Sequence, residues 1–240
     1  MAETLFLHGW GLHGGIWARL GTRLPGHAPD LPGYGDVPPV VPYSAEALAD
    51  ALAAGLGGAV NLVGWSMGGM VALALAARYP DKVAKLVLVG TSPAFVNRPG
   101  WALGLEPDVL AGFASDLSRD YRATLLRFLA LQARGGDDAR TVVGRLRATV
   151  FARGEPAPAV LAAGLELLRD VDLRGLAGAV ACSTLVVHGA HDTLCPAEAA
   201  GWLAEHIPQA RLALHPGASH APFLSHPEWF AQTVAAFLHG

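Results

Sequence analysis

Short apolar runs alternate along the chain with longer segments of helical periodicity. Five runs are typical of buried strands, and the short segment 28–30 is expected as a sixth; the five are 4–8, 60–64, 85–90, 183–188 and 211–215. Apolar spacing predicts helices at 16–24, at 44–56 with Ser44 as its N-cap, between residue 66 and Pro80, at 196–206 and at 227–238. This alternation predicts an α/β fold with a mostly parallel sheet of about six strands flanked by helices.

The pattern changes between residues 97 and 179. This segment has no strand-like run, and apolar residues recur at helical spacing, as at Leu110, Phe113 and Leu117. Helix-breaking residues fall at 135–136 and 154–156. We therefore expect about four helices inserted as a cap at 97–179, between a first core part at 1–96 and a second at 180–240.

The clearest motif is Gly64-x-Ser66-x-Gly68, which lies between a predicted strand and a predicted helix. A strand that turns into a helix within one residue strains the backbone of the central serine, and the flanking glycines let the two segments approach closely. Such a nucleophile elbow holds the serine hydroxyl at the carboxyl edge of the sheet. The motif also occurs by chance in a chain with 29 glycines, so the prediction depends on the strand and helix around it.

A serine nucleophile needs a histidine base, and the base needs a carboxylate that orients it. Asp192 follows the strand predicted at 183–188, and His220 follows the strand predicted at 211–215. Taken singly, Asp192 could be a turn former and His220 is one of ten histidines. Because all three residues follow parallel strands, we predict a triad of Ser66 as nucleophile, His220 as base and Asp192 as acid.

The loop after the first strand, His8-Gly-Trp-Gly11, allows two interpretations. Gly9-x-Gly11-x-x-Gly14 with Asp30 further on matches a dinucleotide-binding fingerprint. That interpretation leaves the serine motif unexplained. We favour an oxyanion hole formed by the backbone N–H groups of Trp10 and Met67.

A second competing pattern is His188-x-x-His191-Asp192, which could indicate metal ligands. No second cluster in the sequence completes a set of four ligands, and we expect no metal.

Composition excludes several classes of protein. With 52% hydrophobic and 15% charged residues the chain is globular, and its two cysteines form no disulfide framework. No apolar run approaches the roughly 18 residues of a membrane span, and residues 1–4 lack a signal-peptide pattern. These features predict a soluble, cytoplasmic protein that does not bind membranes. The net charge of −3 argues against nucleic-acid binding.

Arginines concentrate in the predicted cap. Residues 119–153 contain eight arginines and three aspartates, which gives this segment a net charge of +5. Arg127 and Arg134 are seven residues apart, as are Arg140 and Arg147, so each pair would share a helical face. One explanation is an ordinary solvated surface. The other is a docking patch for an acidic partner, with Arg127, Arg140 and Arg147 as its candidates.

Together these features resemble the α/β-hydrolase family, and within it the carboxylesterases of biotin synthesis that hydrolyse the methyl ester of pimeloyl-[acyl-carrier protein]. The resemblance covers nearly the whole chain and rests on the segments 8–11, 64–69, 107–113, 127–132, 164–168, 171–174 and 220–227. The cap segments are the most specific. The family's usual N-terminal strands before the first loop are shortened or missing here, and its cap arginines are matched only in part, at Arg127 and Arg140.

The resemblance implies an α/β-hydrolase fold and a serine carboxylesterase that needs no cofactor and acts on an ester borne by acyl carrier protein. It implies the same triad, and substrate contacts from Trp10, Met67, Phe128, Gln132 and His220. A broad-specificity esterase, a carbon–carbon bond hydrolase of the same fold and a binding module without activity are the alternatives. We expect a monomer.

Overall fold

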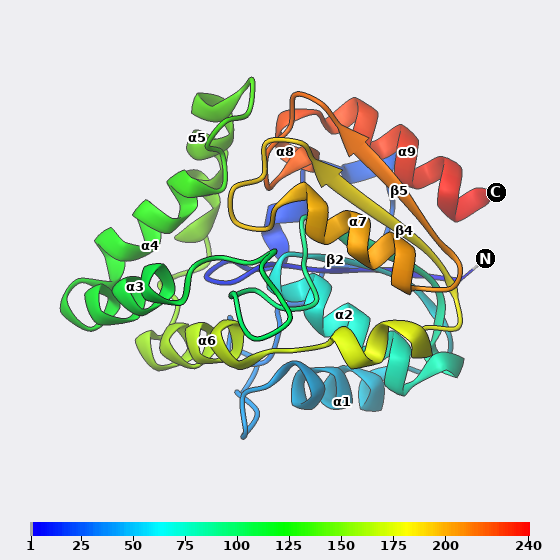
Figure 1. Cartoon of the computed structure of the whole chain (residues 1–240), viewed down its shortest axis with the longest axis horizontal. Helices are drawn as coiled ribbons and strands as arrows, with labels where there is room; N and C mark the ends of the chain where they lie inside the picture. Colours follow the sequence, from blue (N-terminus) through cyan, green and yellow to red (C-terminus); the bar gives the residue numbers. More distant parts are fainter. Residues whose placement is uncertain (1) are drawn as a thin grey trace.

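A parallel sheet of five strands forms the centre of the protein. The computed structural model describes residues 2–240, and its strands lie side by side in chain order with every neighbouring pair parallel. Their bounds are β1 Thr4–Leu7, β2 Val60–Trp65, β3 Val83–Val89, β4 Ser183–Gly189 and β5 Ala210–His215. The predicted α/β fold is confirmed (Figure 1).

The first forty residues contain less regular structure than the sequence pattern predicted. Segment 28–30 is not a strand, because Pro29 has no N–H to extend a ladder. Instead His27 bridges to β1, with Phe6 N–H donating to His27 and His27 N–H to Thr4, both at 2.8 Å. The helix expected at 16–24 is two 3₁₀ helices, η1 Gly14–Trp17 and η2 Gly21–Arg23, separated by turn residues 18–20. Gly21, the first residue of η2, has a φ of 44° that a regular helix does not allow.

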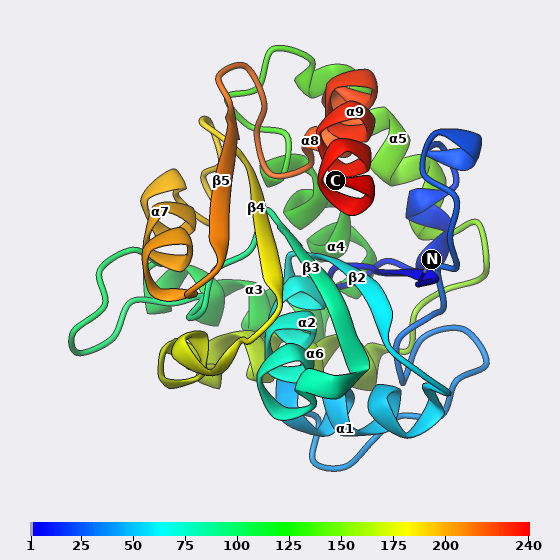
Figure 2. The same cartoon turned by 90° about the vertical axis from the view of Figure 1, so that its right-hand side faces the viewer.

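Helices cover both faces of the sheet. One face carries α1 Ala45–Gly55, α2 Met67–Arg78 and α7 Ala197–His206, and α9 Pro227–His239 lies against the other (Figure 2). Helix α1 begins as predicted, because Ser44 Oγ accepts a hydrogen bond from the N–H of Ala47 at 3.1 Å. Three short helices are also present: η3 Pro80–Lys82, η4 Arg174–Ala179 and α8 Pro222–Ser225.

Four helices lie beside the carboxyl end of the sheet (Figure 1). They are α3 Pro107–Arg119, α4 Tyr121–Leu131, α5 Ala139–Val150 and α6 Pro158–Asp170. We call residues 97–179 the cap segment. The breaks between helices fall at Gly135 and Gly154, both with positive φ. Because α4 ends at Leu131, Arg134 lies outside it, and the prediction that Arg127 and Arg134 share a helical face is wrong.

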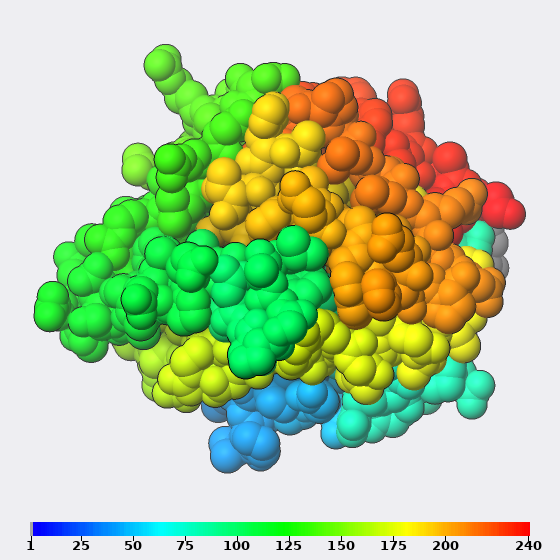
Figure 3. Space-filling model, in the orientation of Figure 1, coloured from blue at the N-terminus to red at the C-terminus, as the bar shows by residue number. Residues whose placement is uncertain are grey.

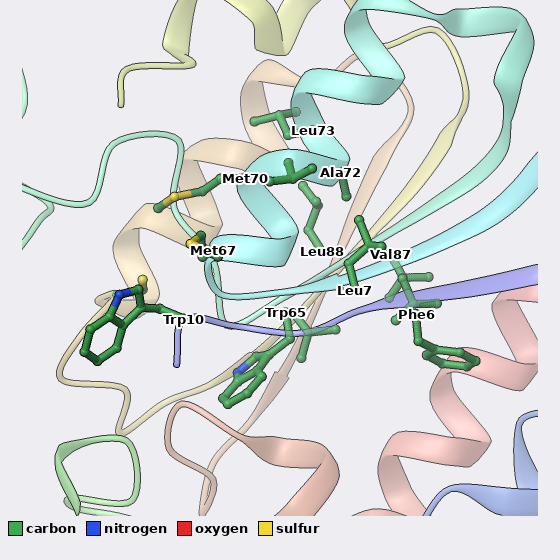
Figure 4. Packing of buried hydrophobic residues seen from close by; sticks show 14 of the residues in the cluster. Phe6, Leu7, Trp10, Trp65, Met67, Met70, Ala72, Leu73, Val87 and Leu88 are labelled. Atoms are coloured by element: carbon green, nitrogen blue, oxygen red, sulfur yellow. The ribbon is translucent and has the colours of Figure 1, made fainter. Parts of the chain in front are cut away.

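The core is built on both sides of the central strands. Figure 4 shows Met67, Met70 and Leu73 along α2, with Trp65 and Phe6 on the opposite side of the strands. These five side chains are all buried. Because both faces are covered, the strands carry continuous apolar runs, and their polar ends are left to form a site.

Gly68 marks the tightest contact between α2 and β1. A Cβ built on it would lie 2.7 Å from the carbonyl oxygen of Leu7 and closer still to that of His8. We expect Gly68→Ala to lower the free energy of unfolding by about 2–3 kcal/mol, because the clashing atoms are backbone. Urea unfolding measures this change. The matched control is Gly144→Ala in α5, where nothing lies within 4 Å of the added methyl. It should stabilise by about 0.5–1 kcal/mol; equal effects of the two changes would contradict the prediction.

Candidate active site

Ser66 occupies a strained turn between β2 and α2. Its φ of 56° and ψ of −122° make it the only non-glycine with positive φ within residues 2–240. The strain is held by neighbours, since Ser66 N–H donates to Val89 at 2.9 Å and Thr91 Oγ1 donates to the Ser66 carbonyl at 2.8 Å. A side chain of ordinary size at Gly64 would meet Gly69 Cα at 2.7 Å. The backbone strain that the sequence predicted is therefore present, and a strained backbone of this kind is found mainly at functional sites.

Asp192 and His220 meet at the carboxyl ends of β4 and β5. His220 Nδ1–H donates to Asp192 Oδ2 at 2.7 Å, and both side chains are fully buried. The backbone of His220 is fixed on both sides: its N–H donates to Gln132 of the cap segment at 3.1 Å, and its carbonyl accepts from Trp65 Nε1 at 2.9 Å. Trp65 precedes Ser66, so this bond ties the histidine loop to the strained turn.

The other ring nitrogen of His220 is free. Nε2 is buried and has no hydrogen-bond partner in the part of the chain that the structure describes. With a hydrogen on Nδ1, a neutral His220 has a bare lone pair on Nε2 that can accept a proton. A buried acceptor without a partner is uncommon in a folded protein, and it marks this nitrogen as a point where an exchangeable proton is expected.

Asp192 is held as a carboxylate. Its Oδ1 accepts backbone hydrogen bonds from Leu194 at 2.9 Å and Cys195 at 3.0 Å. Burial acts to raise the pKa of the Asp192 carboxyl, but the charge interaction with His220 and the hydrogen bonds from His188 and His220 outweigh burial and hold that pKa well below its usual range. The group therefore stays charged beside His220.

The loop after β1 lies against Ser66. A Cβ built on Gly9 would be 3.2 Å from Ser66 Cβ. His8 fixes the start of the loop: Leu31 N–H donates to its Nε2 and its Nδ1–H donates to the Gly9 carbonyl, both at 2.9 Å. Burial lowers the pKa of His8 to about 4, so the ring is neutral at pH 7. The backbone of Trp10 follows directly in this loop.

Met67 is the first residue of α2, and its N–H therefore has no partner inside the helix. The same helix N-terminus points at the turn that carries Ser66. The N–H groups of Trp10 and Met67 remain our candidates for the oxyanion hole.

The cap segment completes a buried apolar cluster around Trp10. The Trp10 and Phe128 rings meet edge to face with centroids 4.8 Å apart, and Trp10 Nε1 donates to Leu161 at 2.9 Å. A Cβ on Gly164 would lie 2.5 Å from Trp10 Cδ1, so α6 can pack this closely against Trp10 only because residue 164 is glycine. Met67 lies beside Trp10 (Figure 4). Gln132 is buried next to His220, and its Oε1 has no partner among the described residues.

The cap segment is closed over this site. On the face shown in Figure 3 its atoms pack directly against those of the core. Hydrogen bonds join the two, including Ser219 Oγ–H to Arg134 and His13 Nε2–H to Thr149, both at 2.8 Å. Ser66 is only 6% exposed.

The cap arginines differ in their surroundings. Arg127 forms an ion pair with Asp116, and its guanidinium lies 5.0 Å from the centre of the Phe113 ring. Arg140 and Arg147 are both exposed on α5, two helical turns apart, and neither forms an ion pair with any residue from 2 to 240. Their positive charge is therefore available to a partner, whereas Arg127 shares the Asp116 carboxylate with Arg119.

The two competing motifs have structural explanations. Asp30 accepts a hydrogen bond from Gly14 N–H at 2.7 Å and pairs with Arg153 of the cap segment at 3.2 Å, so it links loop and cap. His188 is buried whereas His191 is exposed, and no group of three metal-ligating side chains is found among the described residues. In the same part of the chain, no helix has the length and apolar character to cross a membrane.

Several contacts at the site had no signal in the sequence. Tyr34 OH accepts the N–H of Gly11 at 3.0 Å, and the carbonyl groups of Leu161 and Gln132 bind Trp10 and His220. Backbone carbonyls are the same in every residue, so no residue type could have marked them.

Comparison with known proteins agrees with the fold. Residues 4–233 match the alpha/beta hydrolase family, and the chain belongs to that family, which makes it a hydrolase. A pimeloyl-[acyl-carrier protein] methyl ester esterase of Aromatoleum aromaticum is 45% identical over 99% of this chain and 98% of its own length. The enzyme of the same name from Nitrosomonas europaea is 41% identical over 98% and 94%. Among solved structures, an esterase from Exiguobacterium antarcticum superposes with a TM-score of 0.87 at 25% identity, covering 100% of this chain and 92% of that one.

Proposed function

We propose that this protein is a serine carboxylesterase that hydrolyses the methyl ester of pimeloyl-[acyl-carrier protein], releasing methanol and a free carboxylate. The observation that carries the proposal is the buried Asp192–His220 pair, whose Nε2 has no hydrogen-bond partner among residues 2–240. The Trp65–His220 hydrogen bond ties this pair to the strained turn at Ser66. The relatives that carry this esterase's name support the substrate, because they match the chain along almost its whole length.

In the first half of the reaction Ser66 Oγ attacks the carbonyl carbon of the methyl ester, and its proton passes to His220 Nε2. The Asp192 carboxylate holds the imidazole with Nε2 toward the serine and stabilises the imidazolium that forms. The N–H groups of Met67 and Trp10 donate to the oxygen that becomes negative. Collapse of this intermediate breaks the carbon–oxygen bond to the methoxy group, which leaves as methanol with the proton from Nε2.

In the second half a water molecule replaces methanol. His220 Nε2 takes one proton of the water as its oxygen attacks the acyl-enzyme carbonyl. The bond to Ser66 Oγ breaks, and the proton returns to that oxygen. The product is a carboxylate on the far end of the acyl chain, and the serine and the neutral histidine are regenerated.

The cap segment fits the proposed substrate in two ways. Trp10, Met67 and Phe128 form an apolar wall suited to a linear acyl chain, and Gln132 brings a free amide oxygen beside the wall. The exposed Arg140 and Arg147 suit an acidic carrier protein on the outside. We therefore propose that residues 97–179 act as a cap that both lines the site and receives the carrier, with the enzyme working as a monomer.

The test is turnover of the carrier-bound methyl ester by the purified protein. We expect kcat/KM for this substrate to exceed that for the free pimeloyl methyl ester by about tenfold or more, because the carrier adds binding energy remote from the reacting bond. Product is measured as released methanol and as the carrier species that has lost one methyl group. Good turnover of aryl esters without turnover of the carrier ester would favour the broad-specificity esterase. Absence of all turnover, with no labelling of Ser66 by a fluorophosphonate, would favour a binding module.

A further inference from the structure

His188 is a buried histidine that the proposed reaction does not use. It lies near the carboxyl end of β4, four residues before Asp192, and its ring is fully buried. Its Nε2 lies 2.7 Å from the Cys195 carbonyl oxygen and 3.2 Å from Asp192 Oδ2. The oxygen that accepts from His220 is therefore also close to a second imidazole.

The hydrogen on this nitrogen is fixed by its neighbours. A backbone carbonyl and an ionised carboxylate are both acceptors only, so Nε2 of His188 must carry a hydrogen. It donates this hydrogen to the Cys195 carbonyl, and the Asp192 carboxylate is the next nearest acceptor. Its Nδ1 has no hydrogen-bond partner among residues 2–240. Burial lowers the pKa of His188, but the hydrogen bond and charge of Asp192 and the Cys195 carbonyl outweigh it and leave that pKa raised. Either protonation state keeps the Nε2–H donor.

With this contact each oxygen of the Asp192 carboxylate has two N–H groups beside it. Oδ1 accepts from the N–H groups of Leu194 and Cys195, whereas Oδ2 accepts from His220 and lies 3.2 Å from Nε2 of His188. The backbone donors alone fix one oxygen, and the carboxylate could still rotate about its bond to Cβ. The Nε2–H group of His188 beside Oδ2 limits that rotation and offsets part of the negative charge of the carboxylate, which would otherwise act on His220 alone.

We propose that His188 is a positioning residue that orients the Asp192 carboxylate toward His220 and limits how strongly that carboxylate stabilises the imidazolium. The proposal rests on the proposed triad. Its physical basis is that a second N–H group beside a carboxylate weakens the interaction of that carboxylate with the first donor, here the His220 imidazole. The titratable groups around the pair are Asp192 and Cys195 in the loop after β4, Glu198 in the first turn of α7, and His220 itself.

Two replacements of His188 distinguish the effect of losing its N–H donor from the effect of losing the volume of its ring. Gln can place a side-chain N–H near the position of His188 Nε2 without a titrating group, whereas Met fills similar space and donates nothing. In His188→Met the whole charge of Asp192 acts on His220 and stabilises its protonated form more strongly. Since the base must be neutral to accept the serine proton, the acid limb of the kcat/KM profile moves to higher pH.

The experiment is the pH profile of p-nitrophenyl acetate hydrolysis between about pH 5 and 9 for the unchanged protein, His188→Gln and His188→Met. We expect the acid limb of His188→Met to lie about half to one pH unit higher than that of the unchanged protein. Its kcat at the plateau should fall by about tenfold with KM unchanged, because a hydrogen bond to a charged group is lost. His188→Gln should keep the acid limb at the same pH as in the unchanged protein and kcat within about twofold, because its N–H donor is retained.

An unmoved acid limb in His188→Met would overturn the proposal, whatever the loss of rate, because a merely structural role lowers activity without shifting the limb. If His188→Met does not fold, His188→Asn gives the same decision, since its shorter amide cannot span the distance to Asp192. Ser66→Ala is measured alongside with the same ester. If that variant stays active, the triad itself has failed, and a simple ester keeps this outcome separate from any failure of the carrier substrate.

Discussion

Ser66→Ala is expected to lower kcat by about 10⁴-fold or more on every ester tested, because the attacking oxygen is removed and no other described hydroxyl occupies the strained turn. His220→Ala should be comparably severe. The double variant should be little worse than either single one, because the nucleophile and base act as one unit. Initial rates with the carrier-bound ester and with p-nitrophenyl acetate measure both effects.

Two observations keep this result interpretable. The exposed Ser118 on α3 offers a matched control, and Ser118→Ala should keep full activity and full labelling by a fluorophosphonate. Thermal unfolding should show that Ser66→Ala is folded, since the backbone bonds of Ser66 to Val89 and Thr91 do not involve its hydroxyl. A Ser66→Ala protein that retained a tenth of its activity would remove Ser66 from the nucleophile's role.

The second large effect is expected on the outside of the cap segment. Reversing Arg140 and Arg147 together to Glu should lower kcat/KM for the carrier-bound ester by about tenfold, because an acidic carrier then meets negative charge on α5. Hydrolysis of p-nitrophenyl acetate should stay within about twofold, because a small neutral ester gains nothing from the patch. Added salt should lower kcat/KM of the unchanged protein for the carrier-bound ester but not for p-nitrophenyl acetate, since salt screens exposed charges.

The chain offers a control with the same change of charge. Arg19 and Arg211 are exposed and lie outside the cap segment in the sequence, and reversing both to Glu should leave the carrier-bound rate nearly unchanged. An equal loss from both double variants would mean that net charge alone matters, and a loss on both substrates would mean that Arg140 and Arg147 support the cap itself. Either outcome would end the docking proposal. Arg127 is a poorer test, because its reversal also breaks its ion pair with Asp116.

The order of the candidate triad residues along the chain could be predicted from the sequence alone. Ser66, Asp192 and His220 each follow a strand that its apolar run reveals, and parallel strands bring their carboxyl ends to one edge. The strain at Ser66 was equally predictable, since glycines at fixed distances are needed where strand and helix cross closely. The early segment was less predictable. Gly21 interrupts the expected helix and His27 replaces the expected strand, because short polar stretches carry little periodic signal.

What the sequence by itself determined is therefore the class of fold, the order of the candidate triad residues along the chain and the presence of helices between β3 and β4. The tertiary structure alone decided which groups satisfy those residues: the Gln132 carbonyl on His220, Tyr34 under the first loop, and His188 on the far side of Asp192. It also decided that Arg127 pairs with Asp116 while Arg140 and Arg147 are free of ion pairs within the described chain. The reason is physical. Periodicity and strained turns arise between near neighbours and leave a pattern in the chain, whereas hydrogen bonds and charge pairing depend on segments brought together only by folding.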